Sequence, residues 1–516
     1  MTAITGGAFK RLTLSALAAF ALSALTPVQA SAEWLKAESK RFIVYSAGGE
    51  RELRAMVTEL ENFDYVLRFF TGTSQDVVTH RKLPVYVTTT SGLNTVWPGS
   101  SDRISGFYMT SDEDIFAVAT REDNFHVLKH EYAHHFMKQE FNYPYPGWYI
   151  EGFAEYYAPA EINRNVIMVG RPNMDRAQAL SWLQWMPMSE LLSSRPLSQS
   201  RYSDSYYPLA WLLTHWFNGD DSRRPQLTAY LRDVGRGSDP VEAMERATGM
   251  NSQQLRQTLR RYVNGRIPYT GVRTELPPVA MEISRLPRSA DDLLLLGQQL
   301  KVTVSDETKA STLATIRQRA ERHPDDALAL VTLAHAELHN GKDPQKAEEV
   351  LNRLLAIDPN HVEGLQYMAR IYIDRAADAE DYDASIALRR QAQTYLARAY
   401  QADDANYITY MLLARNRNGA EDFPNTNDLE TMSLAYELAP QLPEVSLNYA
   451  QALLFHNRRQ EAIRIIEIVA NNPHGTSQGV RDLLSHARGI SVEQLSAEEE
   501  AIRQRGEEEA GEGEGG

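Results

Sequence analysis

The sequence contains no cysteine among its 516 residues. Disulfide bonds are therefore excluded, and so is a lipoprotein anchor, which needs a cysteine at the cleavage site. Long apolar runs are also lacking near the N-terminus, where residues 12–25 are too short for a membrane-spanning helix of about 20 residues. An excess of positive charge is lacking as well, because 68 acidic residues outnumber 53 lysines and arginines and give a formal net charge of −15. Such an acidic chain is not expected to bind nucleic acid.

The first 32 residues have the pattern of a secretory signal. Lys10 and Arg11 precede the apolar run, and Ala30-Ser31-Ala32 offers small residues for cleavage. We predict that residues 1–32 are a signal peptide, which leaves no stable membrane span; an uncleaved anchor is the alternative. An exported chain without disulfides that carries helical repeats is expected in the periplasm of a Gram-negative-type bacterium.

A metal-binding motif, H-E-x-x-H, occurs at His130-Glu131-Tyr132-Ala133-His134. Histidines four positions apart lie on one face of a helix, so both imidazoles can reach the same ion. Glu131 is placed to take a proton from a metal-bound water. Apolar residues at helical spacing predict the helix, which Asp123 or Asn124 can cap.

A second motif, Glu151-Gly152-Phe153-Ala154-Glu155, begins seventeen positions after His134. It lies on a predicted helix over residues 148–157 that follows two prolines and a glycine. A catalytic zinc has three protein ligands and an open position for water. We therefore predict that His130, His134 and Glu151 bind Zn²⁺.

Together the two motifs resemble those of the gluzincin branch of zinc metallopeptidases. The resemblance implies that Glu151 is the third zinc ligand and Glu131 the general base. It also implies that Glu155 orients a ligating histidine. The rival metzincin pattern fails, because Met137 and Glu140 stand where it needs glycine and histidine. No G-A-M-E-N stretch is present, so the resemblance does not imply exopeptidase activity.

Gluzincins also place a tyrosine or histidine some fifty to sixty residues after the glutamate ligand, where it stabilises the oxyanion. Tyr206 and Tyr207 lie 55 and 56 residues after Glu151. The alternative is that these aromatic rings only pack at the start of an apolar helix over residues 209–217. His215, within that helix, is predicted to be a core histidine.

The segments before the motif predict a sheet with helices. Strands are expected over residues 41–46 and 83–88, with a long helix ending near Gly72 and a hairpin of residues 104–109 and 115–119. By the resemblance, one hairpin strand is a sheet edge that receives the substrate as an added strand; alternatively, both are interior. We predict an α+β zincin-like domain, with a mixed sheet and active-site helices, over residues 33–270. Its segment order is similar to that of exported bacterial proteins of unassigned substrate.

The second half of the chain is predicted to be helical and repetitive. Residues 271–288 contain three prolines and are expected to be a linker. From 289 to 490, loop phrases recur at steps of 35, 45, 36 and 33 residues, close to the tetratricopeptide period of about 34. The longest step indicates an expanded unit around residues 375–383. We predict an all-α tetratricopeptide solenoid, followed by an acidic disordered tail over residues 491–516.

Such an array has a concave groove suited to an extended peptide or a helix of a protein partner, although it can also act only as a brace. The leading hypothesis is a zinc metallopeptidase-like protein of the bacterial envelope. It would hydrolyse peptide bonds of a peptide or protein substrate through a zinc-activated water. One alternative is a non-catalytic tetratricopeptide adaptor with a structural or vestigial zinc site. Another is that no metal binds.

Overall fold

The computed structural model describes residues 34–76, 81–100, 104–121, 125–163, 165–193, 197–472 and 474–491, with scattered residues between 494 and 509. The predicted signal peptide, the capping residues Asp123 and Asn124, and most of the predicted tail lie outside this part. No helix within the described ranges is long and apolar enough to cross a membrane.

A six-stranded mixed sheet has the strand order β4-β5-β3-β2-β1-β9. Its strands are β1 (Leu35–Glu38), β2 (Phe42–Ser46), β3 (Leu83–Thr88), β4 (Gly106–Thr110), β5 (Ile115–Thr120) and β9 (Glu282–Arg285). Strands β2, β3 and β5 run parallel, whereas β4 is antiparallel to β5. The predicted hairpin is confirmed, with β4 at the sheet edge and β5 inside. The alternative that both hairpin strands are interior is wrong.

Both faces of the sheet are covered, which follows from the alternation of side chains along each strand. Val85 and Val87 lie in a hydrophobic cluster with residues of α1 (Glu50–Thr71) and α3 (His126–Glu140). Tyr86, between them, lies in a different cluster with residues of α2 (Thr90–Val96) and α11 (Ser289–Gln299). The first helix of the repeat region is therefore part of the packing of the sheet.

A helical subregion follows α3. Its elements are α4 (Gly147–Tyr157), α5 (Met174–Trp182), α6 (Met188–Leu192), η1 (Leu197–Gln199), η2 (Ser203–Ser205), α7 (Tyr206–Asn218), α8 (Arg224–Val234), α9 (Pro240–Thr248) and α10 (Ser252–Val263). A three-stranded sheet of β6 (Glu161–Asn163), β7 (Val166–Val169) and β8 (Thr270–Arg273) accompanies them. Helix α7 is almost fully buried, and its Trp211 and Phe217 lie in the core of this subregion.

The segment expected to be a linker, residues 271–288, contains most of β8 and all of β9. Strand β9 pairs with β1, from Leu35 opposite Arg285 to Glu38 opposite Glu282. Proline is disfavoured in strand interiors because it cannot donate to the ladder. Pro277 and Pro278 precede β9 and Pro287 follows it, so they mark the ends of a strand within this stretch.

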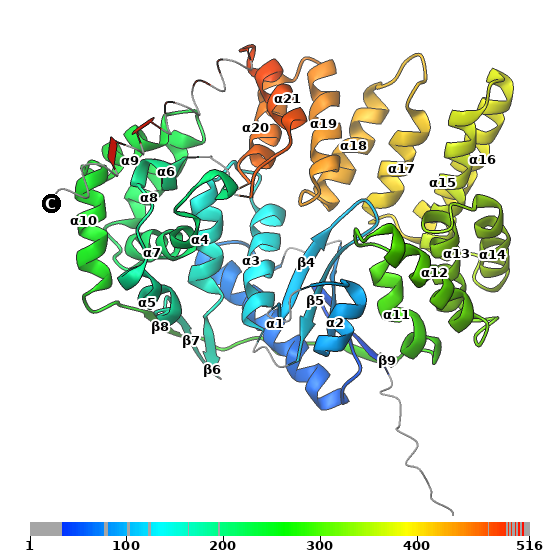
Figure 1. Cartoon of the computed structure of the whole chain (residues 1–516), viewed down its shortest axis with the longest axis horizontal. Helices are drawn as coiled ribbons and strands as arrows, with labels where there is room; N and C mark the ends of the chain where they lie inside the picture. The colour runs from blue at the N-terminus through cyan, green and yellow to red at the C-terminus, as the bar shows by residue number, and fades with distance from the viewer. Residues whose placement is uncertain are drawn as a thin grey trace, which may run out of the picture. The chain divides into compact units, whose positions relative to one another are not determined.

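From α11 onward the described chain is a series of packed helices (Figure 1). They are α12 (Asp306–Ala320), α13 (Ala327–His339), α14 (Pro344–Ile357), α15 (Val362–Asp378), α16 (Tyr382–Ala402), α17 (Tyr407–Arg417), α18 (Thr426–Leu438), α19 (Pro443–Phe455), α20 (Arg459–Ala470) and α21 (Gln478–Arg488). The prediction of an all-α helical solenoid is confirmed. The expanded unit arises because α15 and α16 are long, with 17 and 21 residues.

The repeats contact the sheet region at several points. Gln298 Nε2 donates to Tyr86 Oη at 2.7 Å, and Tyr407 Oη donates to the Ser111 carbonyl oxygen at 3.0 Å. Near the end of the array, Asn471 Nδ2 donates to the Pro144 carbonyl oxygen at 3.2 Å. The described residues after Ala32 accordingly belong to one compact unit.

Candidate metal centre

Helix α3 is anchored on two sides by buried side chains. Tyr132 Oη donates to Asp64 Oδ1 of α1 at 2.7 Å. His135 Nδ1 lies 2.9 Å from Tyr108 Oη of β4. Because a helix turns about 100° per residue, His130 and His134 project from another side, where they are 15% and 16% exposed.

Helix α4 is brought into position by its close packing on α7, which Gly152 permits. A Cβ atom added to Gly152 would collide with Thr214 Oγ1 and would lie 2.5 Å from the Ala210 carbonyl oxygen. The neighbouring Glu151 side chain is buried, with 3% of the residue exposed. The glycine of the E-G-x-A-E motif thus lets a carboxylate approach α3.

Three donor atoms converge between the two helices. His130 Nε2 and His134 Nε2 are 3.1 Å apart, and they lie 3.4 and 3.2 Å from Glu151 Oε2. Ligands at about 2.0–2.1 Å from a tetrahedral zinc are separated by about 3.3 Å. Glu151 Oε2 is buried and has no hydrogen-bond partner. The spacing and chemistry of these donors fit a zinc ion.

The carboxylate and the imidazoles of this cluster shift one another's pKa values. Burial acts to raise the pKa of Glu151, but His134, His130 and His474 outweigh it and hold the pKa well below its ordinary value. Burial acts to lower the pKa of His130, but Glu151 and other carboxylates raise it overall. The charges of Glu151 and His130 therefore stabilise each other.

Glu155 faces the other nitrogen of His130. Its Oε1 lies 3.6 Å from His130 Nδ1. Arg176, on α5, holds the carboxylate with two hydrogen bonds, from Nε to Oε2 at 3.0 Å and from Nη2 to Oε1 at 2.6 Å. A carboxylate behind a ligating histidine orients the ring and sets its tautomer. Glu155 lies beside this nitrogen, at a separation longer than a hydrogen bond.

The two predicted tyrosines occupy different positions at the start of α7. Tyr207 Oη lies 3.4 Å from His474 Nε2, and that nitrogen is 3.7 Å from Glu151 Oε1. Tyr206 is buried in the hydrophobic cluster around α7. Burial raises the pKa of both phenols, and the charge of Glu151 adds to this effect. The Tyr207 hydroxyl therefore lies beside His474, which in turn lies near Glu151.

Glu131 is half-buried on α3 beside His130. Its charge contributes to raising the pKa of His130, Tyr207 and His474. Its charge therefore acts on His130 and on the two side chains beside Glu151, and Glu131 is not one of the three converging ligands.

The sequence interpretation missed Arg176 and His474. Arg176 has no motif of its own and is recognised only by its pair with Glu155. His474 follows α20 in a loop of the repeats, where the sequence indicated only a boundary between repeats. Its side chain is 63% exposed. No local pattern signals a contact between residues this far apart in the chain.

His215 is a core histidine, as predicted. Its Nε2 donates to the Gly170 carbonyl oxygen at 2.7 Å, and its Nδ1 lies 2.9 Å from Tyr262 Oη. The residue is 1% exposed. Burial lowers the pKa of this imidazole.

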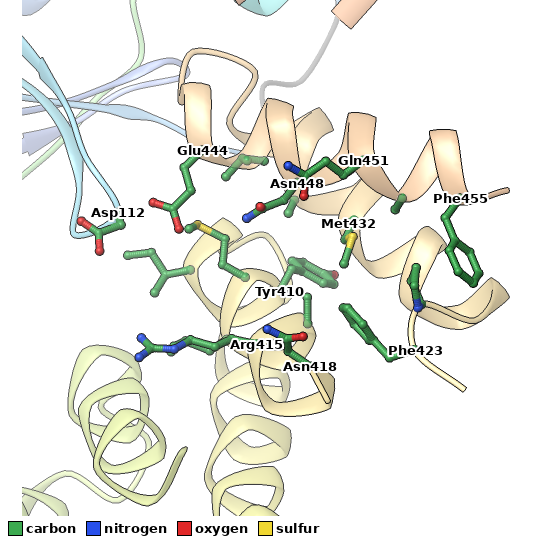
Figure 2. A pocket seen from close by; sticks show the side chains of 18 of the residues that line it. Asp112, Tyr410, Arg415, Asn418, Phe423, Met432, Glu444, Asn448, Gln451 and Phe455 are labelled. Atoms are coloured by element: carbon green, nitrogen blue, oxygen red, sulfur yellow. The ribbon is translucent and has the colours of Figure 1, made fainter. Parts of the chain in front are cut away.

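An open pocket of about 480 Å³ lies between α17, α18 and α19, with Asp112 of the β4–β5 hairpin at its margin (Figure 2). Apolar side chains, including Tyr410, Met432 and Phe455, line it together with the amides of Asn448 and Gln451. Apolar surface combined with amide groups suits a peptide, whose backbone needs hydrogen bonds.

Three solved structures are similar to part of this chain. TTC0263, a tetratricopeptide protein of Thermus thermophilus, is 20% identical over 39% of this chain and 100% of its own, with a TM-score of 0.32. A double mutant of MamA RS-1 is 18% identical over 35% and 95%, with a TM-score of 0.26. MamA from Desulfovibrio magneticus RS-1 is 18% identical over 31% and 85%, with a TM-score of 0.25. No protein-family model and no curated protein matches the sequence.

Proposed function

We propose that this protein is a zinc-dependent peptidase of the gluzincin type that is exported to the bacterial periplasm. One observation carries the proposal. Two histidine nitrogens and a buried carboxylate oxygen, from two different helices, form a triangle with sides of 3.1–3.4 Å. Structural zinc sites prefer four protein ligands, whereas a catalytic site has three and an open position. A glutamate outside the ligand set, Glu131, favours catalysis further.

Each residue has a distinct role in this proposal. His130, His134 and Glu151 would hold zinc, which when bound supplies a Lewis acid and lowers the pKa of water. Glu131 accepts a proton from the attacking water and passes it to the leaving amine. Glu155, held by Arg176, keeps the His130 ring oriented. In this proposal Tyr207 and His474, which lie on the Glu151 side of the centre, would donate hydrogen bonds to the developing oxyanion.

The edge position of β4 supports a peptide as the substrate. An edge strand has unpaired backbone groups on its outer side, and an extended peptide can add to them as a further strand. Tyr108, in the middle of β4, contacts His135 of the motif helix. A peptide paired with β4 would therefore run past the helix that carries His130 and His134.

The test of the metal site is the zinc content of the mature protein, measured by mass spectrometry. We expect His134→Ala to lose the zinc held at this site. His486→Ala, at an exposed position on α21, is the matched control and should retain it. If the zinc content of the wild-type protein and of His134→Ala is the same, the proposal is wrong.

The test of catalysis is cleavage of a peptide library by the zinc-loaded protein. Glu131→Gln removes the base without removing a ligand, so zinc should stay while turnover falls by about 10²–10⁴-fold. Equal cleavage by the wild type and this variant would contradict the assignment of Glu131.

A non-catalytic adaptor is the second candidate, and the pocket between α17 and α19 favours it. In that case the repeats bind a protein partner and the zinc is structural or vestigial. The candidates differ in one result. For the adaptor, zinc binding and partner binding would be unchanged by Glu131→Gln, and no peptide would be cleaved.

A further inference from the structure

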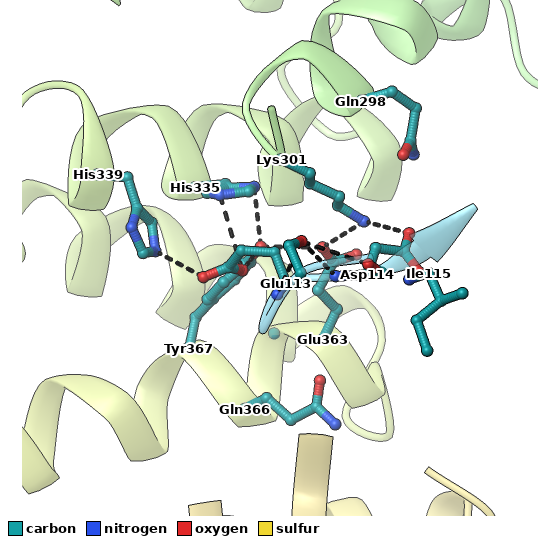
Figure 3. Close-up of polar contacts among 12 residues, drawn as sticks. Glu113, Asp114, Ile115, Gln298, Lys301, His335, His339, Glu363, Gln366 and Tyr367 are labelled. Atoms are coloured by element: carbon teal, nitrogen blue, oxygen red, sulfur yellow. Dashed lines mark hydrogen bonds and ion pairs between the residues drawn. The ribbon is translucent and has the colours of Figure 1, made fainter. Parts of the chain in front are cut away.

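A second cluster of histidines and a carboxylate lies where the β4–β5 hairpin meets the repeats (Figure 3). His335 and His339 stand one helical turn apart on α13, and Glu113 lies in the hairpin loop. Glu113 Oε2 is 3.9 Å from His335 Nε2, and Glu113 Oε1 is 3.6 Å from His339 Nε2. None of these residues belongs to the centre on α3 and α4.

The hydrogen bonds of Tyr367 determine the tautomer of His335. Tyr367 Oη donates to Glu363 Oε1 at 2.9 Å and approaches Glu113 Oε2 at 3.4 Å. Since ionised carboxylates only accept, the single hydroxyl proton is donated on this side, to Glu363 at the shorter distance. Tyr367 Oη, 2.8 Å from His335 Nδ1, must therefore accept the Nδ1 proton. His335 Nε2 is left with a free lone pair directed toward Glu113.

That lone pair has no hydrogen-bond partner. His335 is 2% exposed, and its Nε2 is buried and unpaired, as is the Nε2 of His339. An unpaired buried acceptor is costly unless something occupies the site. A histidine whose Nδ1 is fixed by a hydrogen bond, with Nε2 free, is in the state that metal ligands adopt.

We propose that Glu113, His335 and His339 form a second site, for a divalent transition-metal ion such as Zn²⁺ or Co²⁺. Two imidazoles and one carboxylate are a donor set that suits these ions. The side chain of His339 is 36% exposed, which provides a path for the ion. Bound there, the metal would fasten the hairpin, and with it the edge strand β4, to the repeats.

Neighbouring cations make this site weaker than the first. Arg370 forms an ion pair with Glu113 Oε1, and Lys301 binds Asp114 at 3.1 Å and Glu363 at 3.3 Å. Arg370 competes for the carboxylate and repels an incoming cation. We therefore expect a chelator to remove metal from this site before it empties the His130 site.

The experiment uses the full mature chain and Co²⁺ alone as the probe, followed by visible absorption and by metal content. In the His134→Ala background the first site is disabled, and we expect about one Co²⁺ per chain to remain bound. Adding His339→Ala should abolish this binding. Adding His486→Ala instead should leave it unchanged. His339 is half-exposed, and unchanged circular dichroism would show that its variant folds.

Each outcome decides the proposal. Cobalt lost on His339→Ala but kept on His486→Ala supports it. No cobalt in the His134→Ala protein, or cobalt that persists after His339→Ala, overturns it. Failure of the proposed function gives a different result. In that case His134→Ala would not change the metal content, whereas His339→Ala would still remove the metal bound at His335 and His339.

Discussion

At the residue scale, the glycine of the second motif lets α4 pack closely on α7 because it has no side chain. Gly152→Ala would place a methyl group against Thr214 and the Ala210 carbonyl, so α4 must move away from α7. We expect the free energy of unfolding to fall by about 1–3 kcal/mol, and zinc affinity to fall because Glu151 moves with the helix. Denaturant titration and metal content test both effects. Gly271→Ala is the control, since its Cβ would meet no atom within 4 Å, and an equal loss there would contradict the argument.

Also at this scale, His215 should make stability sensitive to pH. Burial holds its folded pKa below the ordinary value of 6.5, so the unfolded chain takes up a proton first as the pH falls. Stability should therefore decline from about pH 6.5 downward, by at most about 1.4 kcal/mol per pH unit. His215→Gln should flatten this decline between about pH 6.5 and 5, as measured by urea titrations. His486→Gln, at an exposed site, should leave the wild-type slope; an unaltered slope in His215→Gln would contradict the assignment.

At the element scale, one hydroxyl ties the motif helix to α1. Tyr132→Phe removes the hydrogen bond to Asp64, whose carboxylate remains paired with Arg41 and Arg68. We expect the free energy of unfolding to fall by about 1–2 kcal/mol, because a buried carboxylate loses one of its hydrogen-bond donors. Thermal unfolding gives the measurement, and Tyr382→Phe, on a 77% exposed tyrosine, serves as the control. Equal melting temperatures for the two variants would show that this bond does not hold α3.

Whole-molecule packing predicts cooperative unfolding. One hydrophobic cluster includes Phe136 and Met137 of α3 together with Tyr436 and Leu442 of the repeats. A second joins Tyr86 of the sheet to Leu294 of α11. Calorimetry of the mature chain should therefore give one transition, and a fragment of residues 34–288 should not fold because it exposes both surfaces. Two separate transitions, one of them reproduced by the fragment, would contradict this view.

Prediction from the sequence succeeded where the signal is local. The strands near 42–46 and 83–88, the hairpin, the helices of both motifs and the helical repeats were all expected. Their periodicities of 2 and 3.6 residues depend only on which side chains must face a core. The segment 271–288 differs from the linker predicted from its prolines, because β9 lies between those prolines and pairs with β1. A strand of four residues carries little periodic signal, and its partner β1 lies far away in the chain.

In the metal centre, too, the sequence determines the local geometry and the tertiary structure decides the long-range contacts. The spacing within H-E-x-x-H places two imidazoles on one helix face, and this follows from helix geometry alone. That Glu151 meets them at 3.2–3.4 Å, and that Arg176 holds Glu155 behind them, results from the packing of α4 on α3 and α7. The contacts of His474 with Glu151 and of Glu113 with His335 cross from the repeats to the first half of the chain. Such contacts depend on long-range packing, which leaves no pattern in neighbouring residues, so only the tertiary structure could reveal them.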